Sequence, residues 1–326
     1  MTDRVHAGAT TQTSAPWPRR DGAEAPEPAL DTYRALRVGL VAAGLLLLVA
    51  VGIEIARVGV IPGSISATFY SPVRNVLVGS LIAVGLALLA IKGRPGWENG
   101  LLDLAGMLVP LVGLVPTPVV LATVAGSDEL PYRCPDVEVS CVPEQVAPDV
   151  GNNVAAYLLV GLAALLFVGL RALRARVRRR PWPAASERAV VVALALWVAT
   201  GAWFALGRAS FLGYAHYASA IAFFALLVAV VWINARHTSP PPRPRRMTQR
   251  GYRRCYVAVG VAMGAAVAAG AVVWLVAPED HAFPLVFWIE VVLLLLYTVF
   301  WVLQTVEHWE DGIAPEAVRP EALPGA

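Results

Sequence analysis

Charged residues are scarce in this chain, and lysine is almost missing. Asp, Glu, Lys and Arg make up 15% of the 326 residues, and Lys92 is the only lysine among 26 basic residues. A soluble domain carries about 25% charged residues, so this composition argues against an ordinary water-soluble protein. Hydrophobic residues make up 57% of the chain, and the mean hydropathy is +0.62. The composition therefore predicts an integral membrane protein.

Familiar catalytic motifs are missing as well. The sequence contains no Walker loop, no dinucleotide-binding glycine fingerprint, no Gly-x-Ser-x-Gly elbow and no His-Glu-x-x-His pair. No two of the five histidines have the spacing of metal ligands on one helix. We therefore predict no cofactor, no metal site and no nucleic-acid partner, and whether the chain is an enzyme stays open.

The amino-terminal segment lacks the apolar stretch of a signal peptide. Residues 1–34 are polar and rich in proline, which is typical of a disordered tail. We expect a disordered cytoplasmic tail at 1–34, one membrane domain at 35–308 and a second cytoplasmic tail at 309–326.

Long gaps between charged residues predict an all-α fold with eight transmembrane helices. A bilayer core about 30 Å thick needs about 20 helical residues, and unpaired charges are costly inside it. Gaps of this length recur eight times along the chain. The expected spans are residues 37–61, 73–92, 101–124, 151–171, 189–207, 215–235, 255–277 and 284–306.

The arginines predict the orientation, because cytoplasmic loops carry an excess of basic residues. With a cytoplasmic amino terminus, every basic residue except Arg57, Arg74, Arg133 and Arg208 falls on the inner side. Both termini are then cytoplasmic in a multi-pass plasma-membrane protein. Membrane lipids are the expected partners, and anionic phospholipid at the inner basic loops is a candidate.

Cys134 and Cys141 both lie in the long loop 126–150, which this orientation places outside the cell. That compartment permits disulfides, and the spacing allows a small closed loop. We predict a disulfide between them; two free thiols and a metal pair are the alternatives.

Polar residues at membrane depth are the candidate functional residues, and most fall near the outer ends of the spans. We expect them to line one outward-facing pocket, whose candidate residues are Glu54, Ser66, Tyr70, Ser71, Arg74, Asn75, His216 and Glu290. Glu290 is the strongest candidate, because an exposed carboxylate at its depth is costly. We expect it to face the bundle interior and to share a polar cavity with Arg74, either as a protonatable carboxylate or as one that is ion-paired.

The same residues have purely structural roles as alternatives. Glu54 and Arg57 are three residues apart and can pair on one helix face, and Arg74 can reach lipid phosphate. At the inner side, Asp103 suits a helix amino terminus. Glu307 and His308 follow the last span, where we expect them to be solvated.

Two stretches resemble a group of uncharacterised bacterial integral membrane proteins. They are Ser64-Ile65-Ser66 together with Tyr70-Ser71-Pro72-Val73-Arg74-Asn75-Val76-Leu77-Val78-Gly79, and Phe300-Trp301-Val302-Leu303-Gln304-Thr305-Val306-Glu307. This resemblance implies a fold and no activity.

A looser likeness is to the alkaline ceramidase and progestin/adiponectin-receptor superfamily of membrane hydrolases. That likeness matches Ser66 or Ser71 with a serine, Asp103 with an aspartate and, more weakly, His216 with one of three zinc-binding histidines. The His-x-x-x-His pair expected on the last span is missing here.

Three functional hypotheses follow. The leading one is a sensor, carrier or binding protein with an outward-facing polar pocket. The second is a metal-dependent lipid hydrolase of the ceramidase type, whose zinc would have to be bound by His216, His281 and a carboxylate. The third is a structural or assembly subunit of a membrane complex.

Overall fold

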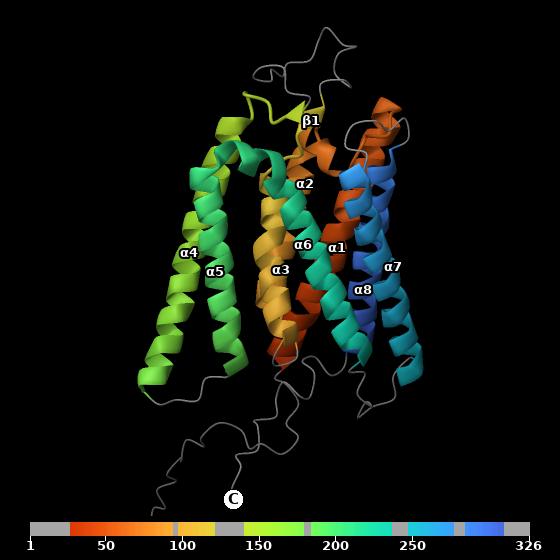
Figure 1. Ribbon diagram of the computed structural model, residues 1–326. Helices are drawn as coiled ribbons and strands as arrows, with labels where there is room; N and C mark the ends of the chain where they lie inside the picture. Colours follow the sequence, from red (N-terminus) through yellow and green to blue (C-terminus); the bar gives the residue numbers. More distant parts are fainter. Residues whose placement is uncertain are drawn as a thin grey trace, which may run out of the picture.

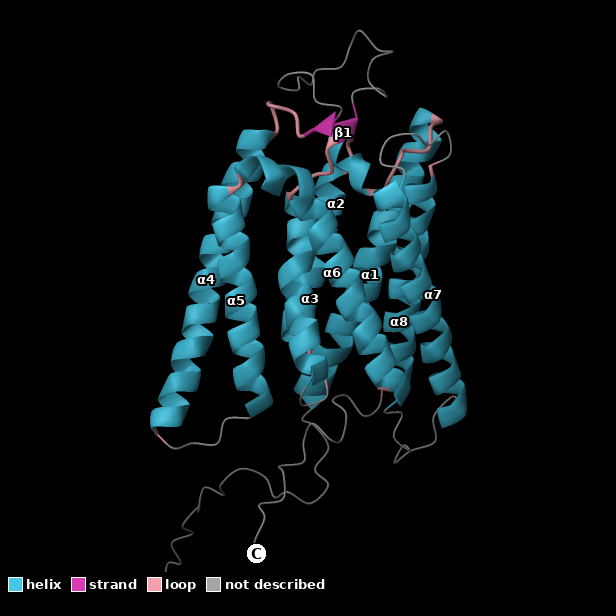
Figure 2. Cartoon of the chain, viewed as in Figure 1, coloured by secondary structure: helices cyan, strands magenta, loops and turns pink. Residues whose placement is uncertain are grey.

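The computed structural model describes residues 27–93, 97–120, 140–178, 184–236, 247–276 and 284–309, and they are mainly helical (Figure 2). The helices are α1 (Glu27–Val58), α2 (Arg74–Ala90), α3 (Trp97–Leu114), α4 (Ala147–Val177), α5 (Ala184–Leu206), α6 (Arg208–Arg236), α7 (Gln249–Val276) and α8 (Leu285–Glu307). A 3-10 helix, η1 (Ser66–Tyr70), precedes α2. Two short antiparallel strands, β1 (Val119–Val120) and β2 (Ser140–Cys141), pair Val119 with Cys141.

The helices lie roughly side by side, so the bundle has two ends (Figure 1). The strand end carries η1, β1 and β2. We call the other end, where α1 begins and α8 ends, the basic end. It carries Arg171, Arg174, Arg176, Arg178, Arg188, Arg236, Arg250, Arg253 and Arg254. Among the described basic residues, the strand end has only Arg57, Arg74 and Arg208.

Within the described residues, six helical segments are long and apolar enough to cross a membrane. They are Leu30–Val58, Ala147–Val177, Arg188–Leu206, Arg208–Arg236, Gln249–Val273 and Leu285–Glu307. The prediction of a multi-pass α-helical membrane protein is thereby confirmed. The two remaining helices, α2 and α3, are shorter, with 17 and 18 residues.

Helices α2 and α3 pack closely because glycines face each other where they meet. A methyl group on Gly85 would lie 2.8 Å from the Gly106 carbonyl oxygen and 2.7 Å from Pro110 Cγ. A methyl group on Gly106 would lie 2.8 Å from the Gly85 carbonyl oxygen. Small residues at such a crossing let two backbones approach, and α3 is buried without interruption from Ala105 to Leu111.

The bundle has a packed part and a lipid-accessible part. Helices α1, α2, α3, α6, α7 and α8 form the packed part, in which α3 packs extensively against both α2 and α6. Helices α4 and α5 lie together at one side (Figure 1). In their most apolar stretches only 11% of the residues are buried, against 39% in α6. The large apolar side chains that α4 and α5 expose are therefore suited to lipid.

The structure corrects two of the predicted boundaries and one predicted exposure. The third expected span, 101–124, ends as a helix at Leu114. Val115 precedes Pro116, and a residue before proline is disfavoured in the α conformation; residues 121–124 lie outside the described part. Helix α1 begins at Glu27, so the expected tail 1–34 overlaps it. Glu307 and His308 are buried, with 4% and 5% of their surfaces exposed, so the expectation that they are solvated is wrong.

Candidate functional site

Glu290 lies at the strand end of α8 and contacts the segment that leads into η1. Its carboxylate accepts hydrogen bonds from the Ile65 amide, from the Ser66 amide at 3.3 Å and from the Ser66 hydroxyl at 2.9 Å. The Phe287 amide donates to the Gly63 carbonyl at 3.1 Å. Hydrogen bonds of two residues, Glu290 and Phe287, therefore join the start of α8 to the α1–α2 connection.

This arrangement explains the hydroxyl-rich sequence before η1. The first amides of a helix have no partners within the helix, and carboxylates and hydroxyls are their usual acceptors. Here Glu290 takes the first two amides, and the Ser64 hydroxyl accepts from the Ala67 amide at 2.9 Å. Glu290 thus has polar partners, and none of its described hydrogen bonds is to Arg74, with which we expected it to share a cavity.

The other charged candidates of the outer set have partners of their own. Arg74 Nη2 lies 3.6 Å from Asp149 Oδ2, and its guanidinium stacks on the Phe69 ring at 4.3 Å. Arg57 donates two hydrogen bonds to the Glu54 carboxylate, at 2.7 and 2.9 Å. This is the pairing on one helix face that the sequence analysis gave as an alternative.

The neutral candidates mostly fix the chain at the strand end. His216 Nδ1 lies 2.8 Å from the Val115 carbonyl oxygen, which fastens α6 to the end of α3. The Tyr70 hydroxyl donates to the Thr117 carbonyl at 2.9 Å, and the Ser71 hydroxyl donates to the Thr68 carbonyl at 2.8 Å. Asn75 is exposed. Among the eight predicted pocket residues, the described side-chain hydrogen bonds join only Ser66 and Glu290, and a backbone bond joins the Arg74 amide to the Ser71 carbonyl at 3.0 Å.

Two candidates of the sequence analysis fall outside the described residues. Cys134 is one of them, so its predicted disulfide with Cys141 stays a prediction; Cys141 itself is buried in β2. His281 is the other. Among the described residues, no three His, Cys, Asp or Glu side chains converge closely enough to hold a metal ion.

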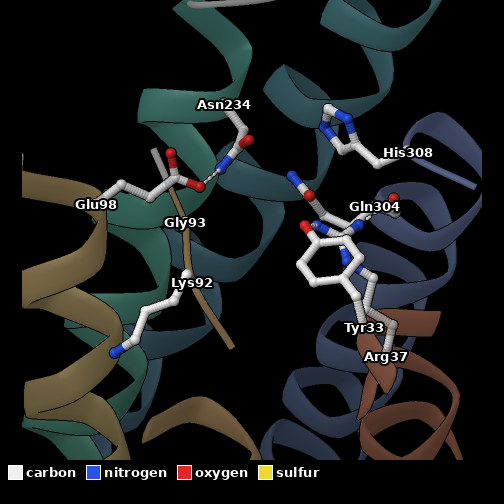
Figure 3. A pocket seen from close by; sticks show the side chains of 8 residues that line it. All are labelled: Tyr33, Arg37, Lys92, Gly93, Glu98, Asn234, Gln304 and His308. Carbon is white, nitrogen blue, oxygen red and sulfur yellow. Dashed lines mark hydrogen bonds between the residues drawn. The ribbon is translucent and has the colours of Figure 1, made fainter. Parts of the chain in front are cut away.

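The basic end holds a polar cluster that the sequence analysis did not identify (Figure 3). Five helices or connections bring its side chains to one cavity. The lining residues are Tyr33 and Arg37 of α1, Lys92 and Gly93 of the α2–α3 connection, Glu98 of α3, Asn234 of α6, and Gln304 and His308 at the end of α8. The cavity offers ≈ 10 Å³ to the centre of a water molecule, which is room for about one water.

Arg37 is the most unusual member of the cluster. Only 6% of its surface is exposed, although it lies ten residues into α1. Its guanidinium donates to the Gln304 carbonyl and to the Tyr33 hydroxyl, and it stacks on the Tyr33 ring at 4.3 Å. These acceptors are neutral, and no described carboxylate lies within 4 Å of the guanidinium. Its Nε has no hydrogen-bond partner among the described residues.

Gln304 brings a second buried donor to the same cavity. It is 3% exposed, and its amide nitrogen has no partner among the described residues. Figure 3 shows this amide pointing across the cavity towards Asn234 and Glu98. A buried polar group without a partner is costly. Two buried donors, Arg37 Nε and Gln304 Nε2, therefore line the cavity without an acceptor among the described residues.

The opposite wall of the cavity carries a carboxylate. Glu98 is 7% exposed, and its Oε1 accepts a hydrogen bond from Asn234 Nδ2 at 3.0 Å. Gly93 passes close to it, since a methyl group there would lie 3.0 Å from Glu98 Cγ. Lys92 Nζ lies 3.7 Å from Asp103 Oδ1 and points away from the cavity (Figure 3).

A neighbouring network continues the cluster into α7. The Tyr256 hydroxyl donates to Glu307 Oε2, and His308 Nε2 lies 3.7 Å from the same oxygen. Weak signals for part of the cluster are present in the sequence. Tyr33 and Arg37 are four residues apart and so share a helix face, and Gln304 and Glu307 are polar residues at the end of an apolar span.

Comparison with protein-family models, with curated proteins and with solved structures gives no match for this chain. The resemblances seen in residues 64–79 and 300–307 therefore stay expectations. A function for this chain has to be argued from its own side chains, and those that call for a ligand lie at the basic end.

Proposed function

We propose that this chain is a membrane carrier or binding protein that takes a compact anionic group into the cavity at the basic end. The observation that carries the proposal is the buried guanidinium of Arg37, whose described partners are neutral oxygen atoms. The proposal keeps the carrier or binding hypothesis of the sequence analysis, but it places the site at the other end of the bundle.

The chemistry of the cavity supports an anion. Burying a charge costs several kcal/mol unless it is paired, and an anion next to Arg37 offsets that cost. Both unpartnered atoms, Arg37 Nε and Gln304 Nε2, are donors, and a donor pair suits an acceptor such as a halide or an oxygen of an oxyanion. The small volume favours a single ion or the tip of a larger group, such as a lipid headgroup phosphate.

We further propose that the two short helices also cross the membrane, which gives eight spans with both termini in the cytoplasm. The basic end then faces the cytoplasm of a plasma-membrane protein, as the excess of arginine there favours. Cys134 and Cys141 then lie outside the cell, where their disulfide forms.

The two other hypotheses have less support. A hydrolase of the ceramidase type needs zinc-binding histidines, and the Nδ1 atom of His216, the candidate ligand that the structure describes, is hydrogen-bonded to the Val115 carbonyl oxygen. No observation among the described residues favours an assembly subunit. We therefore carry neither hypothesis further.

The test is binding to the purified full chain in nanodiscs. In neutral lipid, we expect fluoride, chloride, nitrate or phosphate to raise the thermal stability, by about 2.7 kcal/mol at a concentration of 100 Kd. Nanodiscs that contain anionic lipid and no added anion form the second arm. Stabilisation in that arm alone identifies a lipid headgroup as the source of the anionic group.

Two variants locate the site. Gln304→Met removes a donor that has no described partner, so it should fold normally and bind the anion more weakly. Arg37→Gln should abolish measurable binding. Arg174→Gln is the matched control, because Arg174 is exposed on α4. Unchanged binding in both cavity variants, or no stabilisation by any anion or anionic lipid, rejects the proposed function.

A further inference from the structure

We infer that the anion is a halide ion and that Trp301 is a third residue that binds it. This inference rests on the proposed function and deepens the same site, because it names the class of ligand and one further ligand-binding residue. The inner part of the cavity carries it, since another buried donor lies there without an acceptor among the described residues.

The cavity at the basic end has two adjoining parts. The inner part shares Arg37 and Gln304 with the part shown in Figure 3 and adds, among others, Leu102, Val230 and Trp301. Each of these three lies about one turn further into the bundle on its helix than a residue of the outer part does. The inner part offers ≈ 10 Å³ to the centre of a water molecule, which is room for about one water.

Trp301 is buried in this inner part, with only 2% of its surface exposed. It stands one turn before Gln304 on α8, so the two side chains share a helix face. Its ring packs edge-on against Phe300, with 5.1 Å between the ring centroids. An indole nitrogen can only donate a hydrogen bond. Trp301 Nε1 therefore joins Arg37 Nε and Gln304 Nε2 as a buried donor with no partner among the described residues.

Other tryptophans of the bundle show what this donor does elsewhere in the chain. Trp197 Nε1 donates to the Leu158 carbonyl at 2.8 Å. Trp203 Nε1 donates to the Ser210 hydroxyl at 2.9 Å. A buried indole N–H usually has such a partner. Among the described tryptophans, Trp301 alone buries its nitrogen completely without one.

The lining of the inner part favours a monatomic anion. Apart from the polar residues, its wall consists of Ile91, Leu102, Val230 and Phe300. An oxyanion brings several oxygen atoms, and each one that is buried without a donor is costly. A halide is a single atom that can accept from all three donors, and its charge offsets the burial of the Arg37 guanidinium. Room for about one water suits one halide ion and is too small for a whole sulfate or phosphate group.

The α2–α3 connection separates the cavity from the solvent at the basic end. Lys92 and Gly93 line both parts of the cavity. The Lys92 side chain is 54% exposed, and Gly93 is half-buried. Because Gly93 has no side chain, this cover is thin, and a halide has a short route from the solvent to the inner part. On the opposite wall, Glu98 and Asn234 are hydrogen-bonded to each other.

The first experiment observes the Trp301 indole directly. The full chain is prepared in neutral nanodiscs with isotope-labelled tryptophan, and gluconate, which is too large for the cavity, keeps the ionic strength constant. Added chloride should shift the magnetic resonance of the Trp301 indole N–H until the site is saturated, because the proton gains an acceptor. The indole signals of Trp197 and Trp203 should stay in place, since these groups already have partners. Each signal is assigned by its loss in the matching phenylalanine variant.

The second experiment compares affinities. Chloride and bromide should bind more tightly than nitrate, sulfate, phosphate or anionic lipid. Trp301→Phe keeps an aromatic ring and loses the donor, so chloride should bind at least about tenfold more weakly, as expected for one lost hydrogen bond to an ion. Trp203→Phe is the matched control, because it removes an indole N–H at the strand end; its affinity for chloride should equal that of the wild type.

A third measurement needs no variant. Crystals of the wild-type chain grown with bromide in place of chloride should show an anomalous scattering peak in the inner part of the cavity. The peak should lie within hydrogen-bond reach of Trp301 Nε1 as well as of Arg37 Nε and Gln304 Nε2. A cavity without this peak overturns the halide site even where Trp301→Phe does not fold.

The outcomes separate the two proposals. Absence of stabilisation by every anion and by anionic lipid rejects the proposed function itself. Tighter binding of an oxyanion or of a lipid headgroup than of any halide leaves the anion site in place and overturns the halide. An unmoved Trp301 signal on chloride binding, or unchanged chloride affinity in Trp301→Phe, overturns the assignment of Trp301.

Discussion

Replacing Glu290 with glutamine tests whether this carboxylate fixes the start of η1. The glutamine has nearly the same shape but loses the charge, and one acceptor oxygen becomes an NH2 group. The carboxylate now receives the Ile65 amide, the Ser66 amide and the Ser66 hydroxyl. In the variant, the amide oxygen can still receive the two backbone amides but without a charge, and the NH2 group faces the Ser66 hydroxyl, which must turn round to accept.

The size of the effect follows from the number of bonds. A hydrogen bond to a charged group contributes about 1.5–3 kcal/mol, and a buried donor left without a partner costs about 1–3 kcal/mol. Two bonds to a charged acceptor that fall to the strength of neutral bonds, about 0.5–1.5 kcal/mol each, give an expected destabilisation of about 2–3 kcal/mol. Glu290 is half-buried, so water replaces only part of the lost hydrogen-bond energy.

The assay combines reversible unfolding in mixed micelles with amide hydrogen exchange. We expect the free energy of unfolding to fall by the stated amount. Exchange should quicken at Ile65, Ser66 and Phe287, since the Phe287–Gly63 bond belongs to the same junction. Glu144→Gln, at an exposed position of the strand end, should change neither quantity. A loss below about 0.5 kcal/mol with unchanged exchange at Ile65 and Ser66 would refute the reasoning.

Four further predictions concern packing, surface charge, the cysteines and topology. Gly85→Ala should destabilise the chain by about 1–3 kcal/mol through overpacking. Gly79→Ala on the same helix, where no atom lies within 4 Å of the added methyl group, should be neutral or slightly stabilising. Equal effects of the two substitutions in unfolding assays would contradict the close α2–α3 crossing. Asp149→Asn should cost less than about 1 kcal/mol, because both side chains of its ion pair with Arg74 are substantially exposed; a larger loss in the same assay would show that the pair is more important than its exposure indicates. In intact cells, a membrane-impermeant alkylating reagent should label Cys134 and Cys141 only after reduction, and labelling of both without reductant would exclude the disulfide. A reporter fused after Ala326 should be active only on the cytoplasmic side, and activity on the outer side would overturn the proposed topology.

The helices could be predicted because a bilayer leaves few alternatives. Each of the eight expected spans overlaps a helix, since long apolar gaps between charges can be satisfied in lipid only by helices or closed barrels. The third span was predicted too long, because the prolines at 116 and 118 were counted as part of an apolar run rather than as its end. The prediction of multi-pass helices is confirmed, while the crossing of α2 and α3 stays a proposal.

The candidate site was harder to predict, because it depends on helix rotation rather than on depth. Arg37 was taken as the boundary of a span, since an arginine near a helix start usually faces water or lipid phosphate. In the structure it faces the bundle interior, and so do Glu98, Gln304, Glu307 and His308. The polar residues at the strand end were predicted as a site but do not form one cavity in the described contacts. Local ion pairs bind the charged ones instead: Glu54 pairs with Arg57, and Arg74 pairs with Asp149.

The short lengths of α2 and α3 have a consequence for the membrane itself. At about 1.5 Å per residue, their 17 and 18 residues span about 26–27 Å, less than the roughly 30 Å of hydrocarbon, while the 32 residues of α1 exceed it. A helix too short for the bilayer draws the lipid inwards and thins it locally. The thinning should be greatest beside the α2–α3 connection, where Lys92 and Gly93 cover the cavity. Under the proposed eight-span topology, a thicker bilayer would bury Lys92 and Gly93 more deeply, so that acyl-chain length would control how easily the proposed anion reaches Arg37.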